Sequence, residues 1–550
     1  MQQLIECVPN FSEGVDQNII NQITAEIETV EGVRLLNVDR GKATNRTVVT
    51  MIGEPAAVIE AAFRAIKKAG ELIDMSKHKG EHPRMGATDV CPLIPVANIS
   101  MQETVKYAQQ LAKRVGEELQ LPVYLYEAAQ PDKKRSNLSH IRAGEYEAFA
   151  KKILHPEWKP DYGPAIFDAK RGATVIGARD FLVAYNVNLN TTSTRRANAI
   201  AFDVREAGRN VEENGVTINK PGTLKAVKAI GWFIEEYGIA QISINLTNIN
   251  ITPVHIAFDE ICNKANERGI RVTGSELVGL IPLKAMLDAG KYFLLKQQRS
   301  AGVSENELIK IAIKSMGLDE LAPFKPEERI IEYMLANKSD SKLIGLTLND
   351  FADETASESP APGGGSIAAY IGSLGISLAT MVANLSSHKK GWDGRWQEFS
   401  NWAEKGQQYK NELLQLVDAD TKAFNQIMYA FALPKANEEE KLLRTKAIQE
   451  ATKYAIEIPF KVMQAAHASL QVIKVMAETG NPNSVSDAGV GALCARSAVM
   501  GAFMNVRINA AGYNDKIFIA DIIAKGAAIE KESIALEAEI LKIVNEKIGL

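Results

Sequence analysis

The chain has 550 residues, 46% of them apolar, so it can bury several hydrophobic cores, and its length predicts roughly three to four domains. A net charge of −4 gives no general electrostatic basis for binding nucleic acid or an anionic membrane. The four cysteines lie far apart without a C-x-x-C pair, which argues against a zinc ribbon or a disulfide framework. The first residues, MQQLIECVPNFSEG, show no secretory signal, so we expect a cytoplasmic protein.

Residues 1–338 contain 15 of the 20 prolines and several short runs rich in β-branched residues. Longer helical patterns separate these runs, and such alternation predicts α/β or α+β sandwiches. A glycine-containing loop, DYGPAIFDAKRGATVIGARD, ends at residue 180, so we predict one subdomain at 1–180 and another at 181–338. The strand-like runs are RLLNVD, RTVVTMIG, PVYLYEA, FLVAYNVNL and AQISINLTNINI, and the helical patterns are AAVIEAAFRAIKKAGELIDM, RRANAIAFDVREAGRN and VHIAFDEICNKANERG.

The last third of the chain has a different composition. PFKPEERIIEYML predicts a capped helix with Pro326 near its start, and a polar linker is expected at residues 339–348. An all-α domain is predicted at 349–550, because prolines are rare there and long helical patterns continue, as in EEEKLLRTKAIQEATKYAIEI and KESIALEAEILKIVNEKI. The segment Ile367–Leu385 is long enough to span a membrane, but its many Gly, Ser, Ala and Thr residues favour a buried, tightly packed helix.

The stretch Lys77–Thr88, KHKGEHPRMGAT, contains the H-x-x-E-H pattern of one class of zinc hydrolase. That metal site needs both histidines on one helix face. Gly80 costs about 1 kcal/mol in a helix, and Pro83 disfavours the α region for the residue before it. We therefore expect no metal, and a constrained loop after a helix that ends near Met75. His82, fixed beside Pro83, suits general acid–base catalysis, although a histidine that only hydrogen-bonds loop backbone explains the pattern equally well.

Two polar stretches of the helical region are candidates for chemistry. LVDADTKAFN places Asp418 and Asp420 two residues apart, so on a helix their side chains point about 200° apart and cannot both face one pocket. The apolar spacing favours neither, and pairing with Lys422 is the structural alternative. PAPGGGS (Pro360–Ser366) lacks the lysine of a phosphate-binding loop, so we expect Gly363–Gly365 to allow close approach of a ligand or another backbone at a helix start.

A further polar loop, GNPNSVSD, contains Asn483 and Asp487 and precedes a helix of small residues expected at Ala488–Ala502. A ligand contact and an ordinary cap by Ser486 or Asp487 account for it equally well. Small residues in AAYIGSLG and GALCARSAVMGA allow close helix contacts, within a core or in a helix-mediated dimer.

Longer strings extend these patterns. The first part of the chain resembles the formiminotransferase family through LIECVPNFSEG, ATNRTVVT, DMSKHKGEHPRMGATDVCPLIPV, VYLYEAA, IRAGEYEAF, GATVIGARDFLVAYNVNL, ELVGLIPLKA and FKPEERIIEYML. The last part resembles formiminotetrahydrofolate cyclodeaminases through APGGGSIAAYIGSLG, LVDADTKAFN, ALPK and GNPNSVSDAGVGA. Together they resemble the bifunctional formiminotransferase–cyclodeaminase family of histidine degradation. One departure, NVEENGVTINKPG (Asn210–Gly222), is interpreted as an exposed insertion without consequence for the chemistry.

The resemblance implies two ferredoxin-like subdomains that transfer a formimino group from N-formimino-L-glutamate to N5 of tetrahydrofolate and release glutamate. It implies that the helical domain then closes 5-formiminotetrahydrofolate to 5,10-methenyltetrahydrofolate and releases ammonia. A methenyltetrahydrofolate cyclohydrolase is the alternative for this second half. Polyglutamylated tetrahydrofolate is the expected one-carbon carrier, and a cytoplasmic homo-oligomer is expected, without metal, nucleic acid or membrane.

The resemblance assigns proton transfer in the first half to His82. Asp39, in LLNVDRGKATNRT, is the candidate to orient the histidine or the amidine, with a turn aspartate beside Gly41 as the alternative. Because the donor is a dicarboxylate, Arg84, Arg46 and Arg179 are candidates to bind it. The family's folate site maps onto Gly163, Pro164, Ala165, Ile166, Phe167, Asp168, Ala169, Lys170, Arg171 and Gly172.

In the second half, ammonia leaves well only when it is protonated, and a carboxylate can cycle between acid and base. Asp418 or Asp420 is the candidate for this role, and the residues leave the choice between them open. Asn483 and Asp487 are candidates for contact with the substrate.

Overall fold

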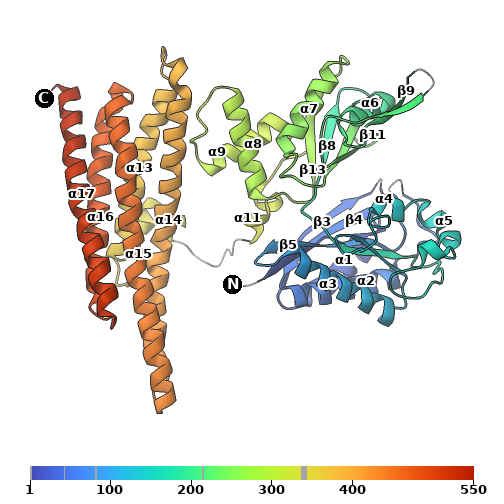
Figure 1. Cartoon of the computed structure of the whole chain (residues 1–550), viewed down its shortest axis with the longest axis horizontal. Coiled ribbons are helices and arrows are strands. Elements are labelled where there is room, and N and C mark those ends of the chain that lie inside the picture. The colour runs from blue at the N-terminus through green and yellow to red at the C-terminus, as the bar shows by residue number, and fades with distance from the viewer. Residues whose placement is uncertain (1–2, 43, 81–82, 214–215, 336–342, 550) are drawn as a thin grey trace. The chain divides into compact units, whose positions relative to one another are not determined.

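The computed structural model describes residues 3–42, 44–80, 83–213, 216–335 and 343–549. The chain forms two compact units, which are described separately (Figure 1). The first unit contains Met1–Ala289 and Ile313–Ala336, and the second contains Gly290–Ala312 and Asn337–Leu550.

The first sheet of the α/β unit has the order β1-β4-β2-β5-β7-β6, with β3 paired to β4. β5, β7 and β6 run parallel, and the other pairs are antiparallel. Its succession β1-α1-β3-β4-α2-β5 is the predicted ferredoxin-like βαββαβ motif, extended by β7 and β6. The strands are β1 (Leu4–Cys7), β2 (Asn10–Phe11), β3 (Val33–Gly41), β4 (Arg46–Gly53), β5 (Thr88–Ala97), β6 (Val123–Glu127) and β7 (Thr174–Ala178).

Amphipathic helices build the core on one face of this sheet, because their apolar residues recur at helical spacing. Ser100 and Glu103 form a capping box at the start of the third helix, which satisfies N–H groups that the helix itself leaves free. A smaller cluster that includes Tyr124, Phe149 and Val175 packs under the short helices. The helices are α1 (Gln17–Glu28), α2 (Pro55–Leu72), α3 (Met101–Glu118), α4 (Leu138–Ile141), α5 (Glu145–Lys152) and η1 (Pro156–Trp158).

The second sheet, β11-β12-β8-β13, is fully antiparallel and repeats the ferredoxin-like succession with helices α6 and α7. Asn210–Gly222, expected as an exposed insertion, contributes most of a separate hairpin whose second strand is wholly exposed. The elements are β8 (Val183–Leu189), α6 (Thr194–Val204), β9 (Arg209–Glu213), β10 (Val216–Lys220), β11 (Val227–Ile234), β12 (Ile239–Leu246), α7 (Val254–Asn266) and β13 (Val272–Val278).

The prediction of one continuous helix from Pro326 onward is wrong, because the segment forms two short helices, α10 (Pro326–Arg329) and α11 (Ile331–Leu335). Ile330 is extended and forms a parallel bridge with Ile281, since Ile281 donates to the Arg329 carbonyl and accepts from the Ile331 N–H. A long-range backbone pairing therefore overrides the local helical preference.

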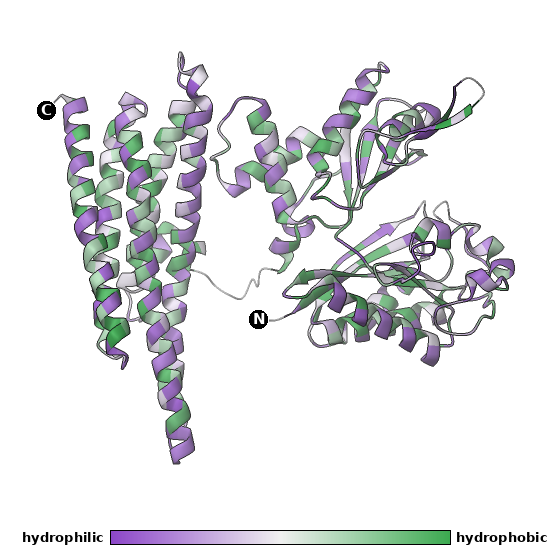
Figure 2. Cartoon of the chain, in the orientation of Figure 1, coloured by the Kyte–Doolittle hydropathy of each residue, from purple (hydrophilic) through white to green (hydrophobic). Residues whose placement is uncertain are grey.

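The second unit is nearly all helical, as predicted, and hydrophobic and hydrophilic stretches alternate along its long helices (Figure 2). The predicted close contact of small residues occurs where a Cβ on Gly375 would lie 2.8 Å from the Gly491 carbonyl oxygen. The elements from residue 343 are η2 (Leu343–Gly345), α12 (Leu348–Thr355), α13 (Gly364–Ser387), η3 (Asp393–Arg395), α14 (Trp396–Ala432), α15 (Glu438–Thr479), η4 (Pro482–Ser484), α16 (Val485–Ala510) and α17 (Lys516–Ile548).

Two helical segments of this unit are long and apolar enough to cross a bilayer, Gly364–Ser387 and Pro482–Ala510. In their most apolar windows, 61% and 50% of the residues are buried inside the structure. Such burial is typical of core helices in a bundle, as the small-residue composition of Ile367–Leu385 predicted.

The helices α8 (Leu283–Lys296) and α9 (Glu305–Met316) each lie partly in Gly290–Ala312, which groups with the helical unit. The sequence-based division at 181–338 places these residues in the second α/β subdomain. The loop between the two helices explains the difference, because the Ala301 N–H donates to Ser400 Oγ (3.0 Å) and the Gly302 carbonyl accepts from Asn384 Nδ2 (2.8 Å).

Candidate functional site

The loop that follows the histidine motif lies against the loop expected to bind folate. The Ala87 N–H donates to the Arg171 carbonyl (2.8 Å), and Gly86 forms a bridge with Gly172. Ser12 holds the other side of the loop, with its Oγ donating to the Gly86 carbonyl (2.7 Å). Gly172 has φ +70°, and a Cβ there would lie 2.7 Å from the Cα of Gly86, so only glycine allows this approach. The fold therefore joins two segments about 85 residues apart in the sequence.

His82, predicted to transfer protons, lies outside the described residues together with Glu81. Its described neighbour His78 approaches the Asn45 carbonyl with Nε2 (2.9 Å), and Nδ1 accepts from Arg84 Nε (3.3 Å). Because Nδ1 accepts, the ring hydrogen is placed on Nε2, and both ring nitrogens bind groups of the surrounding loops. Among the described residues, no three His, Cys, Asp or Glu side chains form a group that could hold a metal ion.

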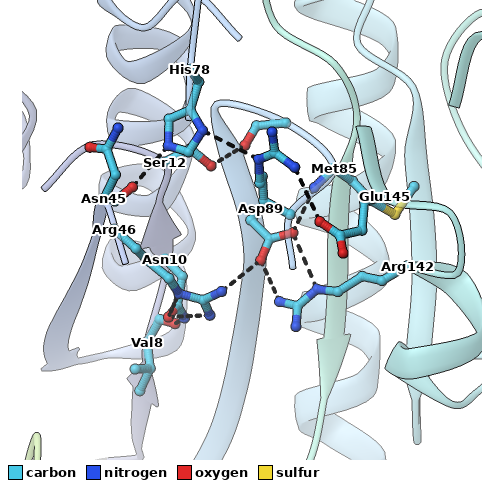
Figure 3. Close-up of polar contacts among 12 residues, drawn as sticks. Val8, Asn10, Ser12, Asn45, Arg46, His78, Met85, Asp89, Arg142 and Glu145 are labelled. Carbon is cyan, nitrogen blue, oxygen red and sulfur yellow. Dashed lines mark hydrogen bonds and ion pairs between the residues drawn. The ribbon is translucent and has the colours of Figure 1, made fainter. Parts of the chain in front are cut away.

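Asp89 lies at the centre of a buried polar cluster, with 1% of its surface exposed (Figure 3). It accepts hydrogen bonds from Arg46 Nη1 (3.0 Å), from Arg142 through Nε (3.2 Å) and Nη2, and from the Met85 N–H (3.0 Å). Arg46 also donates through Nε and Nη2 to Asn10 Oδ1. Burial lowers the pKa of Arg46 to about 10 against the opposing effect of Asp89, so the side chain stays charged at neutral pH.

Arg84 is paired with carboxylates rather than left free for a substrate. Its guanidinium donates to Glu145 (3.1 Å) and to both carboxylate oxygens of Glu147 (2.9 and 2.6 Å). Burial lowers the pKa of Arg84, but these two carboxylates more than offset the effect and raise it. A surface depression of about 430 Å³ is lined by Lys79, Gly80, Arg84, Gly144, Glu145 and Glu147.

The loop Gly163–Gly172 is anchored through its second half. Tyr146 Oη donates to the Ala169 carbonyl (2.5 Å), and its ring lies 5.6 Å from the ring of Phe167. Asp168 accepts from the Arg171 N–H and pairs with its side chain, which holds the pKa of Asp168 below its usual value despite partial burial. Ile166, by contrast, is 68% exposed. The loop thus has a rigid base and an open apolar tip.

Asp39 lies within β3, so the turn predicted as the alternative is wrong. Its Oδ2 accepts from the Gly279 N–H (3.0 Å), which links the two sheets of the α/β unit. Arg179 follows β7 and donates to the Asp180 carbonyl (2.9 Å), and its charge lowers the pKa of Glu6, which burial raises to about 7. Among the described residues, no hydrogen bond joins Asp39 or Arg179 to Asp89.

In the helical unit, the two candidate aspartates of α14 point to different partners. Asp420 accepts from Ser366 Oγ (2.9 Å) in the first turn of α13, and a Cβ on Gly365 would lie 2.3 Å from its Oδ1. Asp418 accepts from the Leu343 N–H (2.8 Å). The two carboxylates thus have partners on different segments, as their spacing on the helix predicts, and of the two Asp420 lies at the glycine-rich helix start.

The protonation of Asp420 is set by opposing effects. Burial raises its pKa, while hydrogen bonds from the side chain and backbone N–H of Ser366 lower it, and the net shift is upward. The helix N-terminus also favours the anion. A carboxyl group in this balance is suited to hold a proton and to release it.

Asn483 and Asp487 lie near the start of α16. The helix begins at Val485 rather than at the expected Ala488, so Asp487 lies in its first turn and is not its N-cap. The predicted cap by Ser486 or Asp487 is therefore wrong. Asn481 instead accepts from the Asn483 N–H (3.3 Å) and caps the short 3-10 helix that precedes α16.

Sequence reasoning did not single out Arg142, Glu145 and Glu147, although all three lie within IRAGEYEAF. The available signal was a dense charged stretch around Gly144, which has φ +86° and starts α5. Arg142 pairs with Asp89 and Glu145 pairs with Arg84, and in both pairs the two residues are more than 50 positions apart in the chain.

The fold and the two sites define a two-site enzyme, with one site in a pair of ferredoxin-like subdomains and another in a helical bundle. Residues 4–179 match the family described as "Formiminotransferase domain, N-terminal subdomain", residues 184–336 match "Formiminotransferase domain", and residues 347–527 match "Formiminotransferase-cyclodeaminase".

Named relatives agree with this division. The formimidoyltransferase-cyclodeaminase of Gallus gallus is 45% identical over 519 residues, 94% of each chain. The glutamate formimidoyltransferase of Streptococcus pyogenes is 41% identical over 54% of this chain and 94% of its own length. The methenyltetrahydrofolate cyclohydrolase of Methylorubrum extorquens is 34% identical over 37% of this chain and 98% of its own length. The chain belongs to the formiminotransferase-cyclodeaminase family.

Proposed function

We propose that the chain catalyses two successive reactions of folate one-carbon metabolism. The first transfers the formimino group of N-formimino-L-glutamate to N5 of tetrahydrofolate and releases glutamate. The second closes 5-formiminotetrahydrofolate to 5,10-methenyltetrahydrofolate and releases ammonia. The observation that carries the proposal is 45% identity to a named bifunctional enzyme over 94% of both chains.

In the first reaction, N5 of the folate attacks the amidine carbon and becomes positively charged in a tetrahedral intermediate. A base removes its proton, and an acid protonates the departing glutamate nitrogen. His82, beside Pro83, is the proposed group for both steps, because one imidazole can accept the first proton and donate it again. The loop Pro83–Ala87, which continues from His82, is held by hydrogen bonds from several segments, and such support preserves catalytic geometry.

The substrates of this reaction fit the surrounding loops. The exposed tip of Gly163–Gly172, around Ile166, offers apolar surface for the pterin ring, beside the histidine loop. Arg46 is the better carboxylate-binding candidate than Arg84, because Arg84 already faces two carboxylates. We assign Asp39 to contact between the subdomains rather than to the histidine.

In the second reaction, N10 of the folate attacks the formimino carbon, and the nitrogen that leaves as ammonia must first be protonated. We assign the proton transfer to Asp420, because burial keeps its pKa raised and the first turn of α13 orients its carboxyl group. We assign Asp418 a structural role, in which its carboxylate accepts the hydrogen bond from the Leu343 N–H. Asn483 and Asp487 remain candidates for substrate contact near the start of α16.

We also propose polyglutamylated tetrahydrofolate as the carrier, a cytoplasmic homo-oligomer acting in histidine degradation, and no resident metal. Apolar side chains on α13 and α16, such as Leu374 and Met504, are exposed in the single chain and would suit contact with another copy. Burial of much of α13 and α16 argues against a membrane-spanning role for either helix.

The test supplies purified chain with formiminoglutamate and tetrahydrofolate and follows glutamate, ammonia and methenyltetrahydrofolate. Equal amounts of the three products are expected. Glutamate release without ammonia, together with hydrolysis of added 5,10-methenyltetrahydrofolate, would instead favour the cyclohydrolase alternative, which the similarity to the Methylorubrum extorquens enzyme suggests. His82→Ala is expected to abolish glutamate release and to leave ammonia release from added 5-formiminotetrahydrofolate intact. Unchanged glutamate release in this variant would exclude His82 from the chemistry.

A further inference from the structure

The Asp89 cluster contains more positive than negative charge. Two guanidinium groups, of Arg46 and Arg142, share the single carboxylate of Asp89, with side-chain exposures of 14%, 12% and 1%. Counted over these three side chains, the charge is +1 in a largely desolvated place, and this charge favours the approach of an anionic group.

The neighbouring arginine is in the opposite situation. Arg84 faces the two carboxylates of Glu145 and Glu147, so its group carries a net charge of −1. An anionic ligand group that enters this region is therefore favoured at the Asp89 cluster and opposed at Arg84.

A β-bulge creates the Asp89 cluster. Asn10 of β2 pairs with Val90, whereas the next residue, Phe11, pairs with Thr88, so Asp89 is the extra residue of β5. Bulges re-aim side chains and are frequent beside active sites. Here the bulge lets Asp89 accept donors from several segments of the chain (Figure 3).

Arg142 uses one edge of its guanidinium for Asp89, through Nε and Nη2. Among the described residues, its Nη1 makes no hydrogen bond, so the edge formed by Nη1 and Nη2 remains able to bind a ligand carboxylate in the bidentate manner typical of arginine. The turn that follows Arg142, through Gly144 and Glu145, lines the 430 Å³ depression beside the histidine loop.

We propose that Arg142, held in place by Asp89, binds one carboxylate of the glutamyl donor. Arg142 is thereby a specificity-determining residue, and Asp89 is a positioning residue. The donor brings two carboxylates to the site, and a net positive, largely buried arginine pair beside the depression matches one of them. This inference rests on the proposed transferase reaction.

The test measures glutamate release by the full chain as donor concentration varies at saturating tetrahydrofolate. Arg142→Gln is expected to raise KM for formiminoglutamate about 10- to 100-fold, the usual cost of losing a charged hydrogen bond, with kcat and KM for tetrahydrofolate little changed. Arg142→Lys keeps the charge but not the planar edge, so a smaller rise is expected. Arg64→Gln, on the helical face of the first sheet and paired with Glu60, is the matched control with unchanged KM.

Two donor analogues separate binding from a merely structural effect. N-formimino-L-glutamine lacks the γ-carboxylate, and N-formimino-4-aminobutyrate lacks the α-carboxylate. Arg142→Gln is expected to lose its effect on KM for one of the two, the analogue without the carboxylate that Arg142 binds. Equal KM increases with the donor and both analogues, or an unchanged donor KM, would overturn the inference.

The outcomes are distinguishable from failure of the proposed function. A wild-type chain that releases no glutamate overturns the transferase reaction and this inference together. If the wild-type chain is active and Arg142→Gln has the same KM for formiminoglutamate, only the inference about Arg142 is overturned. Thermal unfolding of each variant identifies loss of fold, and if Arg142→Gln does not fold, the analogue pattern of Arg142→Lys decides in its place.

Discussion

The Asp420→Asn substitution isolates the acid proposed for ammonia release. It replaces a carboxyl group by an amide of the same shape, so the packing against Gly365 and Ser366 changes little while the transferable proton is lost. General acid–base catalysis contributes about 10²- to 10⁴-fold to a rate, which corresponds to about 3–5 kcal/mol of the activation barrier. We therefore expect ammonia release to fall at least about 100-fold.

Asp418→Asn is the matched control, because it makes the same chemical change two residues away. The carboxylate of Asp418 accepts from the Leu343 N–H at 2.8 Å, and a weakened hydrogen bond there costs about 1 kcal/mol of stability. Ammonia release is expected to stay within about twofold of wild type, since catalysis does not use this contact.

The assay supplies 5-formiminotetrahydrofolate in a single turnover and follows ammonia with a coupled enzyme. Glutamate release from formiminoglutamate, measured on the same preparations, reports whether the α/β unit is intact. Full ammonia release by Asp420→Asn, or its loss in Asp418→Asn, would refute the assignment and the reasoning from side-chain direction on which it depends.

Three further results are expected. Gly365→Ala places a Cβ 2.3 Å from Asp420 Oδ1, so it should displace the carboxyl group and abolish ammonia release while glutamate release continues; normal ammonia release would contradict the geometry. Ser366→Ala removes a hydrogen bond that lowers the pKa of Asp420, so the alkaline limb of the pH–rate profile for ammonia release should move to higher pH, and a downward shift would count against it. Burial raises the pKa of Glu6 from 4.5 to about 7. The contribution of protonated Glu6 to the free energy of unfolding is therefore complete below pH 4.5, and about 3 kcal/mol of it is lost as the pH rises through 7. At pH 8, the Glu6→Gln variant should therefore unfold at a higher denaturant concentration than wild type, and this advantage should be smaller at pH 4. The same difference between variant and wild type at both pH values would reject this linkage.

Local sequence patterns predict many of the helices and strands. The run RTVVTMIG forms β4, AQISINLTNINI contains most of β12 but extends past its end at Leu246, and AAVIEAAFRAIKKAGELIDM contains most of α2. Strand and helix periodicity depend on residues only a few positions apart, so such runs can be found from the sequence. The same holds for the long helices after residue 348. The glycine-rich start of α13 was likewise predictable, since glycine permits close approach wherever it lies.

Local patterns failed where a distant segment competes with the helix. Ile330 leaves helical geometry because it pairs with Ile281, and no periodicity in PFKPEERIIEYML signals that partner. The loop between α8 and α9 belongs with the helical unit for the same reason, since its hydrogen-bond partners are Ser400 and Asn384.

The sequence by itself determined the order of strands and helices, the family, and the short list of aspartates and arginines that could act. Only the tertiary structure separated the two aspartates, because Asp420 meets Ser366 while Asp418 meets Leu343. It also revealed Arg142, which the sequence did not single out and which shares the carboxylate of Asp89 with Arg46. The physical reason is that periodicity and steric limits act over a few residues. The partner of a charged group, by contrast, is whichever side chain the fold brings within hydrogen-bond distance, often more than 50 residues away.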